Sequence, residues 1–441
     1  MRKIVLTTIG TLGDLHPFIA IAQALRRHGF APVLAVAEDQ LAKCRAAGIE
    51  AVAVLPGFDS VQHRLGLAED EAVKRIMGDQ IEMLDQVLLP ALPGCVHKLE
   101  AVTTGAEAII ASTFVFAAPI VAEKLNIPLV SVVLQPMAML SAYDPPCTPD
   151  FWMMKHAPNT VLGRLWNRAV YGTMRLAVQL KCGPQIDRVR TAHRLPHKSA
   201  RRLLETSERS ALTLATYSRH FSPLPPDAPA NVRVVGFPIF DSQSGAEETL
   251  DPALAAFLTD GPAPIIFTLG SFAVHCPGNF YAEAAAAARA LGRRAVLLTG
   301  GHAAPVRDGD IFRCAYAPHS LLFPAAAAVV HHGGAGTTGQ ALRAGKPQLV
   351  VPHMGDQYDH GQRIERLGVG LSMKAHRFTA ARAARMIARL LDEPDYAEAA
   401  ARIGAQVARE HGADAAAAAI AEALGPARVP SRAFVPRLAM A

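Results

Sequence analysis

Short apolar runs alternate with helix-like segments along most of the chain, and turn residues separate them. Near the amino end, this pattern predicts a strand over 3–8, a loop over 10–14, a helix over 17–28 and a strand over 32–37. Further strand-like runs cover residues 108–112, 129–134, 211–215 and 232–235. A strand, a helix and a parallel strand make a βαβ unit, so this half predicts a doubly wound α/β domain.

A second series of the same kind occupies the carboxyl half. It predicts strands over 264–269 and 294–299, with a helix over 281–291 between them. Residues 236–247 combine turn residues with polar ones, which is typical of a linker. The predicted organisation is a first domain over 1–238, a linker over 239–250, a second domain over 251–425 and a C-terminal tail over 426–441.

The strongest chemical signal follows an apolar run over 325–330, which ends in His331-His332-Gly333-Gly334-Ala335-Gly336-Thr337-Thr338. A helix is predicted over 337–344, because helix formers follow and Gly345 with Pro347 ends them. Unpaired N–H groups at a helix start bind anions, and glycine lets a ligand approach the main chain. The loop therefore predicts a diphosphate site, although a plain tight turn would use similar glycines.

The next apolar strand, predicted over 349–351, leads to the adjacent pair Asp356 and Gln357. A carboxylate beside an amide offers the acceptors and donors that vicinal hydroxyls need. With the Gly345-Lys346-Pro347 motif between them, these two segments resemble the donor-binding signature of the family 1 glycosyltransferases. That resemblance implies the GT-B fold, in which two Rossmann-like, doubly wound parallel-sheet α/β domains face each other across a cleft.

The resemblance also implies two sets of donor contacts. The Asp356–Gln357 pair would bind hydroxyls of the transferred sugar. The remaining set would hold the nucleotide diphosphate: His332, Gly334, Gly336, Thr337 and Thr338.

Three further donor-side candidates follow from position. Ser271 comes directly after the first strand of the second series, where its hydroxyl could face the β-phosphate. Tyr316 and His319 lie in a segment that resembles the family's nucleobase-framing region, with Tyr316 in place of a more usual Trp. For each of the three, the alternative is a loop residue that packs locally.

The loop after the first strand faces the same cleft in the predicted fold, since ligands bind at the carboxyl ends of parallel strands. It carries Asp14 and His16, whereas many family members have a catalytic His where Asp14 stands. The Gly13-Asp14 pair resembles a subgroup that includes antibiotic-aglycone and sterol glycosyltransferases and the rhamnosyltransferase of rhamnolipid synthesis. That resemblance implies Asp14 as the base and His16 as its neighbour or as an acceptor contact.

A base is needed because the acceptor hydroxyl must lose its proton as it attacks the anomeric carbon. An unperturbed carboxylate is a weak base at neutral pH, so burial would have to raise the pKa of Asp14. The alternative role for Asp14 is a helix N-cap.

Composition agrees with an ordinary α/β protein: 441 residues suit two or three domains, and about half of the residues are hydrophobic. The six cysteines form no Cys-x-x-Cys pair, and the chain opens without a signal-peptide pattern, so we expect reduced thiols in a cytoplasmic enzyme. Asp308-Gly309-Asp310 is expected to be a solvent turn, and the His353, Asp356 and His360 set is expected to bind no metal. The loop with Gly10 and Gly13 lacks the Gly-x-Gly-x-x-Gly pattern of a dinucleotide site, so a nicotinamide cofactor is not expected.

Charge is uneven, because residues 155–209 hold twelve Lys or Arg against three Asp or Glu. Tryptophans and leucines lie among these basic residues, which predicts either a face for an anionic membrane surface or a solvated helical face. Nucleic acid is not an expected partner, since no binding module accompanies the charge.

The sequence therefore predicts an inverting, metal-independent hexosyltransferase without a cofactor, with a nucleotide-diphosphate sugar as co-substrate and a UDP-sugar favoured. The expected acceptor is a hydrophobic molecule with a hydroxyl group: a phenol, a polyketide or a lipid. One alternative is a dTDP-rhamnose-dependent enzyme of glycolipid synthesis. Others are a GT-B epimerase or hydrolase and a non-catalytic binding homologue. The location is predicted to be cytoplasmic, with possible contact at the inner membrane surface.

Overall fold

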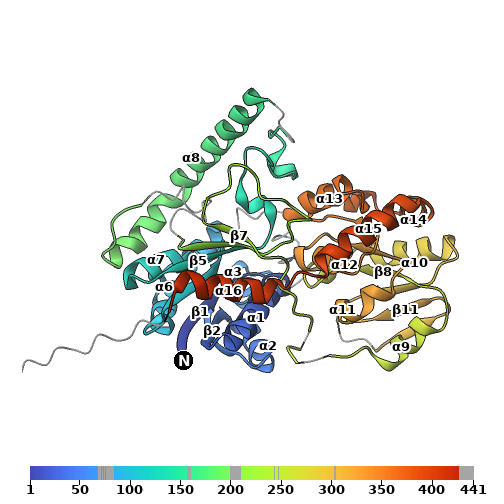
Figure 1. Cartoon of the computed structure of the whole chain (residues 1–441), viewed down its shortest axis with the longest axis horizontal. Coiled ribbons are helices and arrows are strands. Elements are labelled where there is room, and N and C mark those ends of the chain that lie inside the picture. The colour runs from blue at the N-terminus through green and yellow to red at the C-terminus, as the bar shows by residue number, and fades with distance from the viewer. Residues whose placement is uncertain are drawn as a thin grey trace, which may run out of the picture.

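The computed structural model describes residues 1–67, 71, 73, 75, 84–155, 160–198, 210–242, 244–246, 248–301 and 304–426. Two seven-stranded sheets form the frame of this described chain (Figure 1). Apart from Pro426, the predicted tail lies outside the described residues.

The first sheet is wholly parallel and has the strand order β3-β2-β1-β4-β5-β6-β7. Its strands are β1 (Arg2–Thr7), β2 (Phe30–Ala37), β3 (Glu50–Leu55), β4 (Ala108–Ser112), β5 (Leu129–Val133), β6 (Leu212–Ala215) and β7 (Val232–Val234). The strands predicted in this half are confirmed, with ends that differ by one or two residues.

The second sheet has the order β10-β11-β9-β8-β12-β13-β14, and only the β10–β11 pair is antiparallel. Its strands are β8 (Ile265–Thr268), β9 (Ala295–Leu298), β10 (Val306–Asp308), β11 (Ile311–Cys314), β12 (Ala328–His331), β13 (Gln348–Val350) and β14 (Gly370–Ser372). The predicted solvent turn at Asp308-Gly309-Asp310 is confirmed as the β10–β11 hairpin turn.

Helices cover both faces of each sheet (Figure 1). They are α1 (Leu12–Arg27), α2 (Leu41–Ala46), α3 (Phe58–Leu65), α6 (Leu89–Thr103), α7 (Ala117–Leu125), α8 (Val161–Ala192), α9 (Pro252–Thr259), α10 (Phe280–Ala290), α11 (His319–Leu322), α12 (Ala335–Arg343), α13 (Asp356–Arg366), α14 (Ala380–Asp392), α15 (Pro394–Val407) and α16 (Gly412–Leu424).

Alternation along the strands distributes the core between these two faces. Ile4 and Leu6 of β1 pack with α1 and α16, whereas Val5 packs on the other face with α6 and α7. Buried parallel strands are apolar on both faces, which explains why their sequences are continuous hydrophobic runs.

The chain crosses back to the first domain at its carboxyl end. Ala416, Ala417 and Ile420 of α16 belong to the core beneath β1 and α1, and Figure 1 shows α16 lying across the first domain. The predicted domain limits do not describe this return, and they stay a prediction.

Two predicted helix starts are wrong by a few residues. Helix α1 begins at Leu12 rather than Pro17, because Thr11 and Asp14 form a capping box ahead of the proline. Helix α12 begins at Ala335 rather than Thr337, with Gly334 as its N-cap.

None of the six cysteines, all of them among the described residues, forms a disulfide, and Cys44, Cys95, Cys182 and Cys314 are buried. Within the described part of the chain, no helix has both the length and the apolar character that a membrane span requires.

Candidate active site

The predicted site loops lie at the two points where strand order reverses. In the first sheet, the loop after β1 leaves the reversal between β1 and β4; in the second, the loops after β8 and β12 flank the reversal between those strands. Ligands of open α/β sheets bind at such points, beyond the carboxyl ends of the strands. Asp14 and His16 therefore come from one sheet, and Ser271 and His332 from the other.

Asp14 is the third residue of α1, and its Oδ2 accepts a hydrogen bond from the Thr11 backbone N–H at 2.8 Å. Burial, together with a smaller effect of the Asp356 charge, raises the pKa of Asp14 to about 7, although the hydrogen bonds from Thr11 oppose this rise. Asp356 belongs to α13 of the second domain, so the two carboxyl groups predicted for catalysis and sugar binding lie within electrostatic reach of each other. Asp14 therefore caps α1, and its raised pKa is also suited to a general base, so the two roles are compatible.

His16 contacts the linker rather than Asp14. Its ring lies edge-on to Phe240 at a centroid distance of 5.3 Å, and Asp241 is among the charges that act on it. Burial lowers the pKa of His16 to about 4, so the imidazole is neutral at physiological pH, and its Nε2 has no partner among the described residues.

The His332 imidazole is enclosed by two glycines. A Cβ added at Gly270 would come within 2.3 Å of the ring, and one at Gly334 within 2.4 Å. Both glycines therefore allow the ring to lie between the β8 loop and the start of α12. Burial lowers the pKa of His332 well below its ordinary value, and its Nδ1 is buried without a partner among the described residues.

Of the three loop glycines, only Gly333 needs a left-handed backbone, with a φ of 93°. Gly334 is required for the room that His332 takes, and a Cβ at Gly336 would meet open space. His360 of α13 supports the loop, since its Nδ1 donates to the Gly333 carbonyl at 2.7 Å. The loop is thus fixed by a residue from the neighbouring helix, with its open side at Gly336.

Thr337 and Thr338 lie in the first turn of α12. The Thr338 N–H already donates to the Gly334 carbonyl at 2.9 Å, whereas the N–H groups before it in the turn precede the helical ladder. Both threonines are buried, and Thr338 Oγ1 has no partner among the described residues. Buried hydroxyl and imidazole groups without partners are costly in a folded protein. Their concentration with His332 at a helix start fits an anionic ligand that accepts hydrogen bonds.

Asp356 and Gln357 open α13 after Gly355. Gln357 Oε1 accepts hydrogen bonds from the backbone N–H groups of His353, at 2.8 Å, and Met354, at 3.2 Å. This leaves the amide NH₂ as the group able to donate to a sugar hydroxyl. Burial raises the pKa of Asp356, while His360 opposes that effect.

Tyr316 and His319 lie together, with ring centroids 6.3 Å apart. Asp241 of the linker fixes them: it accepts from the Tyr316 hydroxyl at 3.1 Å and from the Ser320 backbone N–H at 2.5 Å. His319 stacks on Phe323 at 4.4 Å. Ser271 is partly buried beside Gly270. The donor-side candidates therefore all lie on the loops that follow β8, β11, β12 and β13 or in the first turns of the helices that these loops lead into.

An ion network joins α13 to the first domain. Arg363 donates to Asp359 at 2.7 Å, to Asp144 at 2.6 Å and to Ser222 at 2.9 Å. Burial opposes ionisation of Asp144, but Arg363 and Arg366 outweigh it and lower the pKa of Asp144. The network fixes α13 against the loop that follows β5.

Comparison with known proteins identifies the family. Residues 4–143 match the glycosyltransferase family 28 N-terminal domain, and residues 305–424 match the C-terminal domain of erythromycin biosynthesis protein CIII-like proteins. The vancomycin aglycone glucosyltransferase of Amycolatopsis orientalis is 30% identical over 377 residues, which cover 84% of this chain and 85% of that protein. This chain is a family 1 GT-B glycosyltransferase.

Other similar proteins agree with this assignment. The O-mycaminosyltylonolide 6-deoxyallosyltransferase of Streptomyces fradiae is 29% identical over 440 residues, covering 95% of this chain and 97% of that protein. The solved structure of the glycosyltransferase VinC in complex with DTDP has a TM-score of 0.68 and 19% identity, over 96% of this chain and 99% of that one. The predicted GT-B fold is confirmed.

Sequence reasoning missed three residues that shape the site of this glycosyltransferase. The sequence pattern places Asp241 in a linker, His360 belongs there only to a set that is expected to bind no metal, and no motif marks Arg363. Each acts on a partner far away in the sequence: Arg363 and Asp144 are 219 residues apart. No local motif marks such pairs, although the i, i+4 spacing of Asp359 and Arg363 is visible in the sequence.

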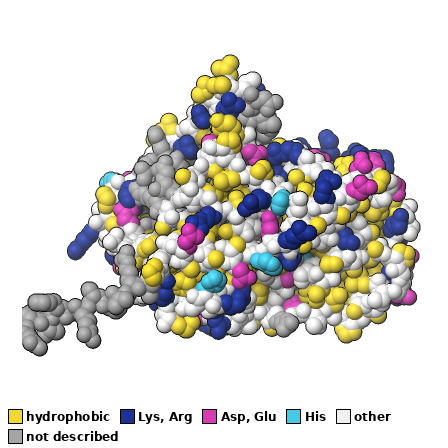
Figure 2. All heavy atoms as spheres, in the orientation of Figure 1, with side chains coloured by type: hydrophobic (Ala, Val, Ile, Leu, Met, Phe, Trp, Pro, Cys, Tyr) yellow, Lys and Arg dark blue, Asp and Glu magenta, His cyan; other side chains and the backbone are white. Residues whose placement is uncertain are grey.

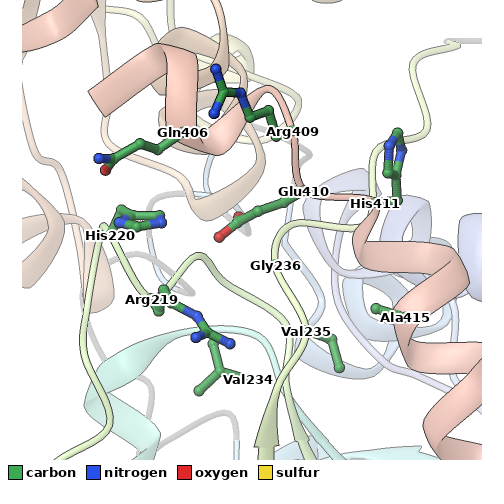
Figure 3. Close-up of a pocket in the computed structure, with 10 residues that line it drawn as sticks. All are labelled: Arg219, His220, Val234, Val235, Gly236, Gln406, Arg409, Glu410, His411 and Ala415. Atoms are coloured by element: carbon green, nitrogen blue, oxygen red, sulfur yellow. The ribbon is translucent and has the colours of Figure 1, made fainter. Parts of the chain in front are cut away.

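A separate pocket of about 520 Å³ lies where the glycosyltransferase chain crosses back to its first domain (Figure 3). The Glu410 carboxylate points into it near His220, and Glu410 Oε1 accepts from the Ser218 hydroxyl at 2.8 Å. None of the predicted site residues lines this pocket: its walls are Arg219, His220, Val234, Val235, Gly236, Gln406, Arg409, Glu410, His411 and Ala415. The pocket belongs to the domain junction and not to the candidate active site.

Proposed function

We propose that the glycosyltransferase moves a hexose from a nucleotide-diphosphate sugar to a hydroxyl of a hydrophobic small molecule, with inversion and with Asp14 as the general base. The observation that carries this proposal is the position of Asp14 opposite Asp356, together with a pKa raised to about 7. A carboxyl group with that pKa accepts a proton at neutral pH far better than an ordinary aspartate does.

In the proposed reaction, the diphosphate binds at the start of α12, where N–H groups, the Thr337 hydroxyl and the His332 imidazole stabilise its negative charge. Asp356 accepts from a sugar hydroxyl, and the Gln357 amide donates to another. The acceptor oxygen attacks the anomeric carbon as Asp14 takes its proton, and the bond to the nucleotide diphosphate breaks on the opposite face. One displacement of this kind inverts the anomeric carbon. We propose no metal and no further cofactor.

A UDP-sugar is the favoured donor, and a deoxythymidine-diphosphate deoxysugar is the second candidate. The second is supported by the 6-deoxyallosyltransferase relative and by the DTDP complex of VinC. One form of this second candidate is a dTDP-rhamnose-dependent enzyme of glycolipid synthesis, which would use the same loops with a lipid acceptor.

The test is nucleotide release from UDP-glucose, UDP-galactose, UDP-N-acetylglucosamine and dTDP-rhamnose, each with a phenol, a polyketide aglycone or a β-hydroxy fatty acid. We expect release with one donor class, dependent on the acceptor and unchanged by EDTA, and a product anomer opposite to that of the donor by NMR. Release without acceptor would favour a hydrolase or epimerase. An absence of binding to every nucleotide sugar would favour a non-catalytic homologue.

The pH profile provides a second prediction. Asp14 must be ionised to act as the base, and its pKa is raised to about 7. We therefore expect kcat/KM to fall about tenfold for each pH unit below 7 and to level off above it. Steady-state rates with a non-ionising aliphatic alcohol as acceptor measure this, because a phenol would add its own titration. A profile that stays flat from pH 5 to 8 would remove Asp14 from the role of base.

A further inference from the structure

Residues 161–180 of α8 expose an apolar face. Leu162 is 78% exposed, Leu180 is 71% exposed and Trp166 is 47% exposed. Leu165 and Leu176 share this face at helical spacing, since residues three, four, seven and eleven apart project in similar directions. Figure 1 shows the amino-terminal end of α8 standing out from the first domain, and Figure 2 shows hydrophobic side chains at its tip.

The opposite face of the same helix holds it on the protein. Asn167 is buried and donates to the Ala142 carbonyl at 3.1 Å, and the Tyr171 hydroxyl donates to the Ser141 carbonyl at 3.2 Å. Further along, Cys182 and Ile186 enter the core of the first domain. The exposed apolar face is therefore a second face on a well-anchored helix, and large exposed apolar patches mark interaction sites.

The charge of the residues around this apolar face indicates which kind of partner it binds. Residues 155–180 include Lys155, Arg164, Arg168 and Arg175 but no Asp or Glu. Lys155 and Arg168 are exposed, and the Arg164 guanidinium lies 5.0 Å from the Tyr143 ring centroid. The three arginines project from the flank and back of the helix and not from the apolar stripe itself, since they lie roughly 110–150° around the axis from it. A basic flank without acidic residues favours an anionic surface over a second copy of the same basic segment.

Aromatic residues add a second argument. The chain has only two tryptophans, and both are exposed here: Trp166 on α8 and Trp152, 77% exposed, just before it. The Trp166 Nε1 donates to the Met153 carbonyl at 2.8 Å, which ties the two segments together. Tryptophan is enriched where proteins meet the headgroup region of a bilayer, since its ring is apolar and its N–H is polar.

We propose that this surface, formed by Trp152, Met153 and the exposed face of α8 from Val161 to Leu180, docks on an anionic lipid bilayer. The loop that Asn167 and Tyr171 hold, from Ser141 onward, then lies close to the bilayer, and this loop reaches α13 through Asp144 and Arg363. A hydrophobic acceptor dissolved in the bilayer is thereby brought to the first domain. The docking itself does not depend on which sugar is transferred.

The full-length protein is mixed with phosphatidylcholine vesicles with and without phosphatidylglycerol, and binding is measured by co-sedimentation and tryptophan fluorescence. We expect binding to the anionic vesicles, weakened by salt, with a blue-shifted emission that bromine-labelled lipid chains quench. Because both tryptophans lie on the proposed surface, quenching locates the contact without any substitution. An absence of binding, or binding without quenching, would overturn the proposal.

The variant Leu162→Glu/Leu165→Glu tests the apolar face. We expect vesicle partitioning to fall about tenfold or more, because two apolar contacts are replaced by two negative charges. Val306→Glu, at an exposed valine on the edge of the second sheet, is the matched control and keeps wild-type partitioning. Equal loss in both variants would contradict a specific surface. If sedimentation velocity shows that the α8 variant converts an oligomer into a monomer, the face is a subunit interface and the proposal is wrong.

Discussion

Replacing Asp14 with asparagine is expected to lower kcat by about 10²–10⁴-fold, the usual contribution of a general base. Asparagine has nearly the same shape and keeps a carbonyl oxygen that can accept from the Thr11 N–H, so the capping box retains its main-chain bond. What the substitution removes is the proton acceptor. Single-turnover rates on saturated donor complexes separate this loss from any change in donor binding.

Stability should move in the opposite direction to activity. The pKa of Asp14 is raised from 3.8 to about 7, so the folded state binds a proton more tightly than the unfolded state does. That contribution to stability is complete below the unfolded pKa and is lost as pH rises through the folded pKa of about 7. At pH 8 the Asp14 carboxylate is therefore a cost, and Asp14→Asn should unfold at a temperature no lower than wild type.

Asp260→Asn serves as the control for this substitution. Asp260 is exposed and pairs with Arg307 at 2.9 Å on the far side of the second domain, so its replacement should leave both kcat and the melting temperature nearly unchanged. If Asp14→Asn kept near-wild-type kcat with a melting temperature well below wild type, Asp14 would be a cap alone.

The elements of this fold were predictable because the strands are buried on both faces and their sequences are uninterrupted apolar runs. Periodicity gave β1, β8 and β12, and glycine chemistry gave the loop that follows β12. Neither signal predicts the return of α16 to the first domain, since an alanine-rich helix such as 412–424 fits against either sheet. Which sheet it covers depends on packing with α1 that no local pattern encodes.

The candidate site also contains residues that a local motif predicts and residues that it does not. The roles of His332, Asp356 and Gln357 stay predictions; as candidates, these residues of loop motifs were predicted from the sequence. The residues that hold those loops in place were not, because their partners come from other elements: Asp241 bonds Tyr316 across 75 residues, and His360 bonds Gly333 across 27. Sequence motifs mark the groups that are predicted to bind a ligand, whereas the supporting contacts follow from the tertiary fold.

Arg363→Met is expected to destabilise the enzyme by about 3–5 kcal/mol, the usual effect of removing one partner from a buried ion network. The Arg363 side chain is 4% exposed, and its partner Asp359 is fully buried. Methionine fills much of the volume but leaves the Asp359 carboxylate with only the Cys147 N–H, at 3.1 Å, among the contacts of the described residues. Calorimetry at neutral pH measures the loss as a lower melting temperature.

Arg366→Met is the matched control, because Arg366 also pairs with Asp144, at 3.2 Å, but is 48% exposed. Solvent screens such a pair, so its loss should cost at most about 1 kcal/mol. A second-site change, Asp359→Asn, should restore part of the stability of Arg363→Met, since it removes the charge left unpaired in the interior. Equal melting temperatures for Arg363→Met and Arg366→Met would show that the network contributes little.

The Arg363→Met substitution also tests how the donor and the acceptor are brought together. Arg363 lies two turns from Asp356 and Gln357 on α13, and it is bonded to Asp144 on the loop that α8 holds. Loss of this bond should therefore raise KM for both donor and acceptor at a temperature where the variant is still folded, with a smaller change in kcat. A purely structural role would lower the amount of folded enzyme and leave both KM values unchanged.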